Sequence, residues 1–129
     1  MNIKRMVFRI LMLEDGQDDA GLIKRALQKG GILFDARVVD SREKFLQQIK
    51  DFSPDVILSD HSLPQFNSIE ALQICRDGGF KIPFILVTGT VSDQFASQLL
   101  KMGASGYVLK SDLEKLPHFL LDTLKIETD

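Results

Sequence analysis

Four apolar stretches of strand length are each followed, within two residues, by a side chain that could take part in chemistry. In chain order they are Val7–Leu13 with Glu14 and Asp15, Val56–Leu58 with Asp60, Ile82–Val87 with Thr88, and Tyr107–Leu109 with Lys110. If these stretches are parallel strands of one sheet, their carboxyl ends meet at the edge where open α/β sheets bind ligands. The sequence therefore predicts one site that contains carboxylates, a hydroxyl and an ammonium group.

Grouped carboxylates need a cation, because like charges held together raise each other's pKa. Glu14, Asp15 and Asp60 offer hard oxygen ligands, which suit Mg²⁺. Lys110 is a compact point charge suited to a phosphoryl oxygen, and Thr88 adds a hydroxyl donor. Each group alone has an ordinary explanation as a surface charge, a strand-end cap or a loop acid. Together they indicate phosphoryl transfer to aspartate, with Asp60 as the attacking group.

Alternating strands and helices are predicted to position these side chains. Leu33–Val39 is a further, weaker strand, and a helix pattern follows each strand, starting near Asp18-Asp19, Ser41, Asn67, Ser92 and Ser111. The five alternations with short connections predict an α/β fold, a doubly wound five-stranded parallel sheet with helices on both faces. Asp18 and Asp19 are interpreted as caps or first-turn acids of the first helix rather than as ligands. Pro117 is expected to kink or delay the last helix.

The bulk composition predicts one globular domain over residues 1–129, with 44% hydrophobic and 26% charged residues. A net charge of -2 provides no field that would attract nucleic acid, so direct binding to it is not expected. The single cysteine, Cys75, fits a reducing compartment and is expected to be a buried apolar residue. No apolar stretch approaches the roughly 20 residues that span a bilayer. These features favour a cytoplasmic protein.

The order and spacing of the polar groups resemble the receiver domain of two-component response regulators over nearly the whole chain. The matching pieces are Glu14-Asp15, Asp60 within PDVILSD before Leu63-Pro64, Thr88 after IPFILV, and Lys110 after GASGYVL. The motifs are most similar to receivers attached to sensory histidine kinases or PAS-containing signalling proteins. The resemblance implies a flavodoxin-like sheet with strand order 2-1-3-4-5.

The resemblance also implies a phosphoacceptor at Asp60. The phosphoryl group would come from a phosphohistidine on a histidine kinase or a histidine phosphotransfer protein. Asp15, Asp60 and the backbone carbonyl of Ser62 would bind Mg²⁺, and Glu14 would act mostly through water. The protein would assist its own phosphorylation and dephosphorylation without being an enzyme in the usual sense.

A conformational switch is implied in the same way. Thr88 and Lys110 would hold the phosphoryl group, and Tyr107 would turn inward as Thr88 moves toward the phosphate. The surface formed by the fourth helix, fifth strand and fifth helix, from about Ser92 to Lys125, would then change. We expect that surface to contact a downstream signalling protein, an effector domain or a second copy in a homodimer.

Two positions depart from the family pattern. Asn67-Ser68 stands where the family usually has Asp-Gly, and Ser111 follows Lys110 where it usually has a proline after a cis peptide bond. A trans Lys110–Ser111 bond is expected, because a non-proline cis bond costs about 3 to 4 kcal/mol. His61 is expected to have a packing or gating role rather than to act as a base, because adjacent strand residues point to opposite faces.

Three alternatives remain open at this stage. A receiver-like protein-binding module would keep the fold without phosphorylation. A Mg²⁺-dependent phosphatase with an aspartyl nucleophile would resemble Asp-x-Asp after the first strand, whereas Asp60 lies after the third and is followed by His61-Ser62. A flavin carrier would need a Ser/Thr-rich phosphate loop after the first strand, where this chain has Glu14 and Asp15.

Overall fold

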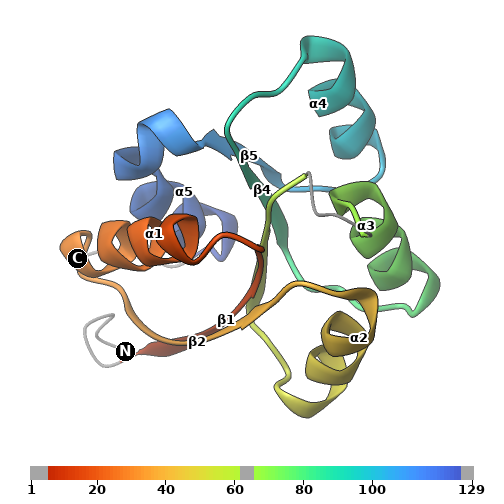
Figure 1. Cartoon of the computed structure of the whole chain (residues 1–129), viewed down its shortest axis with the longest axis horizontal. Coiled ribbons are helices and arrows are strands. Elements are labelled where there is room, and N and C mark those ends of the chain that lie inside the picture. Colours follow the sequence, from red (N-terminus) through yellow and green to blue (C-terminus); the bar gives the residue numbers. More distant parts are fainter. Residues whose placement is uncertain (1–5, 62–65, 126–129) are drawn as a thin grey trace.

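The computed structural model describes residues 6–61 and 66–125. These residues form a central sheet of five parallel strands between two layers of helices (Figure 1). The strands are β1 Val7–Leu13, β2 Leu33–Val39, β3 Val56–Ser59, β4 Phe84–Thr88 and β5 Gly106–Leu109, in the order β2-β1-β3-β4-β5. The predicted doubly wound, flavodoxin-like fold is therefore confirmed.

The described residues also form five α-helices and one 3₁₀ helix. They are α1 Gln17–Lys29, α2 Arg42–Asp51, α3 Ser68–Asp77, α4 Asp93–Lys101, the 3₁₀ helix η2 Lys110–Lys115 and α5 Leu116–Thr123. The side chains of Ser41, Asn67 and Ser92 cap α2, α3 and α4 by accepting a hydrogen bond from an amide of the first turn. Among residues 6–61 and 66–125, no helix is long and apolar enough to cross a membrane.

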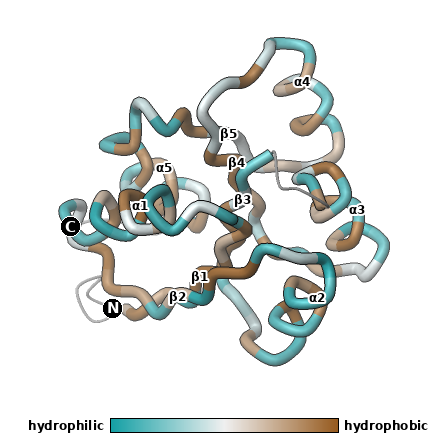
Figure 2. Tube along the Cα trace, viewed as in Figure 1, coloured by the Kyte–Doolittle hydropathy of each residue, from teal (hydrophilic) through white to brown (hydrophobic). Residues whose placement is uncertain are grey.

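Side chains alternate between the two faces of the sheet and form one apolar core on each face. In β1, Ile10 and Met12 face the core that α1 and α5 cover, whereas Leu11 and Leu13 face the core under α2, α3 and α4. In Figure 2 brown stretches lie along the central strands, and teal stretches run along the outer helices. Because both faces are covered, β3 is buried at every position, and Asp60 follows directly from rigid structure.

The last helix begins later than the sequence pattern predicts. An α-helix was expected to open at Ser111-Asp112, but η2 occupies these positions, and Asp112 has a non-helical backbone at φ -126° and ψ 35°. Pro117 supplies the reason, because a proline lacks an N–H and is tolerated in the first turn of an α-helix. The predicted delay by Pro117 is confirmed, and the Lys110–Ser111 peptide is trans as expected.

The end of α4 is tied to α3 by a single arginine. The guanidinium of Arg76 donates hydrogen bonds to the carbonyl oxygens of Met102 at 2.9 Å and Gly103 at 2.7 Å. Gly103 has a left-handed backbone at φ +104°, and a Cβ there would lie 2.6 Å from Arg76 Nε. Glycine is therefore the residue that both the backbone and the arginine contact require.

Candidate functional site

The carboxyl ends of β1 and β3 bring two carboxylates together. Leu13 pairs with Ser59, and the amide of Asp60 donates a hydrogen bond to the Leu13 carbonyl at 2.9 Å. The residue after each of these strand ends is an acid, so Glu14 and Asp60 lie side by side. The structure therefore supplies, through a backbone hydrogen bond, the proximity expected from a parallel sheet.

The hydroxyl and ammonium groups follow from the other two strands. β4 lies next to β3, and Thr88 at its end pairs with Leu109 of β5, which directly precedes Lys110. Thr88 is buried, with 5% of its surface exposed, whereas Tyr107 is 40% exposed. The strand-end side chains predicted to meet thus stand at one edge of the sheet.

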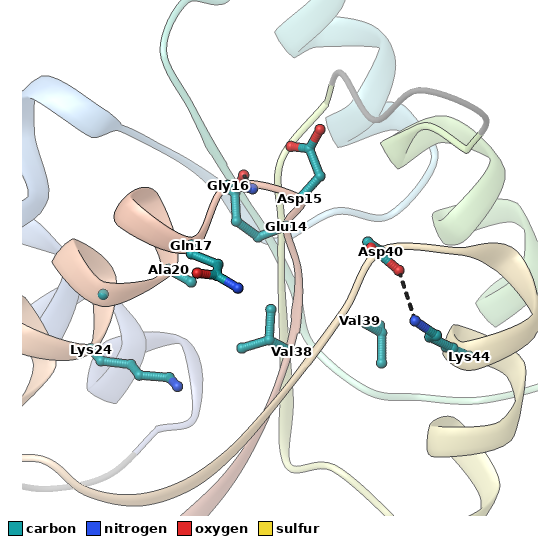
Figure 3. A pocket seen from close by; sticks show the side chains of 11 residues that line it. Glu14, Asp15, Gly16, Gln17, Ala20, Lys24, Val38, Val39, Asp40 and Lys44 are labelled. Carbon is teal, nitrogen blue, oxygen red and sulfur yellow. Dashed lines mark hydrogen bonds and ion pairs between the residues drawn. The ribbon is translucent and has the colours of Figure 1, made fainter.

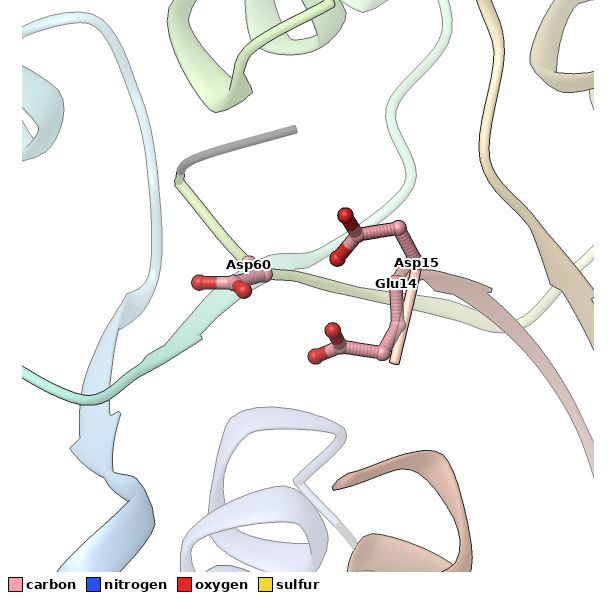
Figure 4. Close-up of side chains that lie close together, drawn as sticks. All are labelled: Glu14, Asp15 and Asp60. Atoms are coloured by element: carbon pink, nitrogen blue, oxygen red, sulfur yellow. The ribbon is translucent and has the colours of Figure 1, made fainter. Parts of the chain in front are cut away.

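Three carboxylates form a compact acidic cluster at this edge (Figure 4). Glu14, Asp15 and Asp60 each offer an oxygen, and these oxygens all lie within 4.8 Å of one another. Glu14 is buried, Asp60 is half-buried and Asp15 is exposed. The cluster therefore extends from the protein interior to solvent.

Lys110 is the cation of the cluster. Its Nζ lies 2.9 Å from Glu14 Oε2, 3.1 Å from Asp60 Oδ2 and 2.7 Å from Asp19 Oδ2. Burial alone would lower the pKa of Lys110, but the contacts with these carboxylates outweigh it and raise the pKa above its ordinary value. Lys110 therefore stays charged at neutral pH.

The two oxygens of Glu14 have different surroundings. Oε1 accepts from the amide of Gly16 at 3.1 Å, whereas the buried Oε2 lies 2.9 Å from the ammonium of Lys110 and, among the described residues, accepts no aligned hydrogen bond. Burial raises the pKa of Glu14, an effect that Lys110 and the Gly16 amide offset only in part. Three carboxylates grouped in this way are a donor set that fits a hard divalent cation such as Mg²⁺. Ser62 lies outside the described residues.

Both carboxylate oxygens of Asp60 have partners. Oδ2 faces Lys110, and Oδ1 accepts a hydrogen bond from the amide of His61 at 2.7 Å. The imidazole of His61 packs against the Phe95 ring, with ring centroids 4.1 Å apart, and its Nδ1 lies 2.9 Å from the Ser68 hydroxyl. The predicted packing role of His61 is confirmed.

Asp19 is the group that the sequence interpretation missed. It does lie in the first turn of α1, as predicted, but its carboxylate also makes the shortest contact with Lys110. The helical phase carried the signal: Asp19 stands four residues before the buried Ile23, whereas Asp18 stands four before the exposed Leu22. Asp19 therefore shares the inward face of α1.

A hollow of about 420 Å³ opens beside the acidic cluster, between α1 and the end of β2 (Figure 3). Glu14 and Asp15 line it together with Lys24 and Lys44. Lys44 is paired with Asp40 at 3.3 Å. The hollow gives solvent a route to the carboxylates from the α1 side.

The strand order and the ligand-binding edge define the chain as a flavodoxin-like α/β protein. The sequence model of the response regulator receiver domain matches residues 10–120. The chain belongs to this family. The predicted similarity to receivers of sensory kinases and PAS proteins stays a prediction.

Several curated relatives are similar over part of their own length. The regulatory protein AtoC of Escherichia coli is 28% identical over 121 residues, which cover 93% of this chain and 26% of AtoC. The response regulator GacA of Pseudomonas syringae is 34% identical over 71 residues, which cover 55% of this chain and 33% of GacA. The chain thus spans about a third or less of these relatives.

Solved structures share the fold. The signal receiver domain of a putative Luxo repressor protein from Vibrio parahaemolyticus superposes with a TM-score of 0.83 at 23% identity, covering 93% of this chain and 92% of that chain. The CheX-CheY-BeF3-Mg²⁺ complex from Borrelia burgdorferi contains a chain with a TM-score of 0.77 at 16% identity, covering 89% of this chain and 87% of that one. These similarities concern the fold.

Proposed function

We propose that this protein is a phosphoacceptor signalling switch, in which Asp60 receives a phosphoryl group from a phosphohistidine donor. The observation that carries the proposal is the position of Asp60 between an ammonium and two further acids, at the carboxyl edge of the sheet. A carboxylate without a chemical role would not need an ammonium and two further acids around it. A carboxylate that becomes an acyl phosphate needs its excess negative charge neutralised.

Lys110 and Thr88 are assigned to the phosphoryl oxygens. Lys110 already touches Asp60 Oδ2 at 3.1 Å, so its ammonium stands where new anionic oxygens would form. Thr88 ends the strand next to β3 and brings a buried hydroxyl to the same edge. Tyr107, exposed in β5, is the aromatic residue proposed to turn inward with Thr88.

Asp15 and Asp60 are proposed to hold Mg²⁺ together with the carbonyl of Ser62, and Glu14 would act mainly through bound water. The close spacing of the Glu14, Asp15 and Asp60 carboxylates supports this assignment. When bound, the ion would neutralise negative charge on the phosphoryl group.

The partners follow from the same proposal. A histidine kinase or a histidine phosphotransfer protein would donate the phosphoryl group, and a downstream signalling protein, an effector domain or a second copy would bind the surface of α4, β5 and α5. The free, buried Cys75 supports a reducing compartment, and we infer the cytoplasm. Residues 1–129 are proposed to act as a single receiver domain.

Phosphate uptake from acetyl phosphate in the presence of Mg²⁺ tests the proposal. We expect one hydroxylamine-sensitive phosphate per chain in the parent protein and none after Asp60→Asn or after chelation of Mg²⁺. Asp51→Asn, at an exposed position of α2, is the matched control and should take up phosphate like the parent. Absence of uptake by the parent would favour the alternative, a receiver-like protein-binding module without phosphorylation.

A further inference from the structure

The side chain of His61 contacts both α3 and α4. Its ring lies against Phe95 in the first turn of α4, and its Nδ1 is 2.9 Å from the hydroxyl of Ser68 at the start of α3. The two ring centroids are 4.1 Å apart and the ring planes are inclined at 53°, so the rings are in direct contact. The imidazole of His61 thus contacts one residue of α3 and one residue of α4.

The backbone of the same residue touches the proposed phosphoacceptor. The amide of His61 donates to Asp60 Oδ1 at 2.7 Å, so a change at this carboxylate acts directly on the position of residue 61. Phosphorylation adds charge and oxygen acceptors at Asp60, which alters the hydrogen bonds that the carboxylate accepts. Asp60 is therefore linked to Phe95 through one residue. The His61 amide contacts Asp60, and the His61 imidazole contacts Phe95.

Phe95 lies in the first turn of α4, where a displacement of its side chain can move the start of the helix. Its amide donates to the side chain of Ser92 at 3.1 Å and so forms part of the N-terminal cap of α4. The other end of α4 is held by Arg76 through the carbonyls of Met102 and Gly103. With that end fixed, a push on Phe95 favours a tilt of α4 over a translation.

We propose that His61 is a positioning residue that couples the phosphorylation state of Asp60 to the N-terminal half of α4. The ring contact with Phe95 carries the coupling, and the hydrogen bond with Ser68 sets the orientation of the imidazole. The inference rests on the proposed phosphoacceptor function and adds a route by which that site reaches α4. The imidazole takes no part in phosphoryl transfer.

Amide chemical shifts before and after addition of beryllofluoride with Mg²⁺, a stable stand-in for the phosphoryl group, test the coupling. In the parent protein we expect shifts at Thr88 and Lys110 and also in the first turn of α4. In His61→Ala the shifts at Thr88 and Lys110 persist, whereas those of α4 fall about fourfold or more, as expected for the loss of a coupled contact. Thermal unfolding of each variant checks that it is folded.

Three further variants separate coupling from general packing. His61→Phe retains a ring and should keep most of the α4 shift, so it also serves if His61→Ala unfolds. Phe95→Ala should reproduce the effect of His61→Ala, and the double variant should add nothing further. Gln98→Ala, at an exposed position of α4, is the control and should behave like the parent.

The outcomes distinguish the inference from the function on which it rests. Full α4 shifts in His61→Ala, with shifts at Thr88 and Lys110 intact, overturn the coupling alone. Loss of the α4 shifts in His61→Phe as well overturns the assignment of the coupling to the ring contact. A parent protein that shows no shift at Lys110 overturns the phosphoacceptor function and the coupling together.

Discussion

Replacing Lys110 by methionine removes the cation of the acidic cluster and keeps an unbranched side chain in its place. In the parent, the ammonium lies within 3.1 Å of oxygens from Asp19, Glu14 and Asp60. After Lys110→Met these carboxylates face one another without it, and Glu14 is the most affected because its side chain is only 3% exposed.

The size of the effect follows from the exposure of each contact. The Asp19 side chain is 43% exposed, so its pair with Lys110 is worth about 0.5 kcal/mol. The Glu14 and Asp60 side chains are 3% and 12% exposed, and charge-assisted contacts of this kind are worth about 1 to 2 kcal/mol each. Methionine does not carry the cost of burying an ammonium group, which reduces the loss of stability by about 1 kcal/mol. We expect a net loss of about 1.5 to 3.5 kcal/mol in the free energy of unfolding.

Urea unfolding at neutral pH without Mg²⁺ measures this loss. The matched control is Lys115→Met, which removes a lysine whose pair with Asp112 is 4.0 Å long and whose side chain is 71% exposed. The control should change the free energy of unfolding by less than about 0.5 kcal/mol. Phosphate uptake by Lys110→Met should fall about a hundredfold, because a charge-assisted donor to the phosphoryl group is lost. Parental stability and parental uptake in Lys110→Met would refute the reasoning.

Three other predictions concern the acidic cluster and the cores. Because burial raises the pKa of Glu14, its contribution to stability is fully present below its ordinary value of 4.5 and is lost as the pH rises through the folded value. In urea unfolding without Mg²⁺, the stability of Glu14→Gln relative to the parent should therefore increase as the pH rises through this range. A pH-independent difference in the free energy of unfolding between the two proteins would contradict this prediction. Burial raises the pKa of Cys75 to about 11, so its thiol should react with a disulfide reagent at pH 8 only as fast as the protein unfolds. Rapid labelling of the folded protein would count against this. Arg76→Ala should lower the free energy of unfolding by about 1 to 2 kcal/mol, because the α4 carbonyls lose a charged donor. Arg25→Ala, at an exposed position of α1, should change it far less.

The strands and most helix starts could be predicted because their signals are local. Val7–Leu13 and Leu33–Val39 match β1 and β2 at both ends, and a polar residue follows each strand directly. Ser41, Asn67 and Ser92 mark helix starts through their own side chains. The shared edge of the sheet then followed from the topology of parallel strands.

The remaining features depend on how distant segments are rotated against one another. The contact of Asp19 with Lys110 joins residues 91 positions apart and depends on the phase of α1 over the sheet. The contact of His61 with Phe95 depends in the same way on the placement of α4. The turn of η2 depends on the competition between Pro117 and the helix preference of its neighbours. Sequence patterns along one segment do not contain these relative placements.

The most direct measurement locates the phosphoryl group on the chain. Treatment with acetyl phosphate and Mg²⁺, followed by borohydride, reduces an aspartyl phosphate to homoserine, which peptide mass mapping identifies. The assignment of Asp60 as the phosphoacceptor predicts homoserine at position 60 and at no other aspartate, including Asp15 and Asp19. Homoserine at one of those neighbours, or at none of the acids, would contradict it.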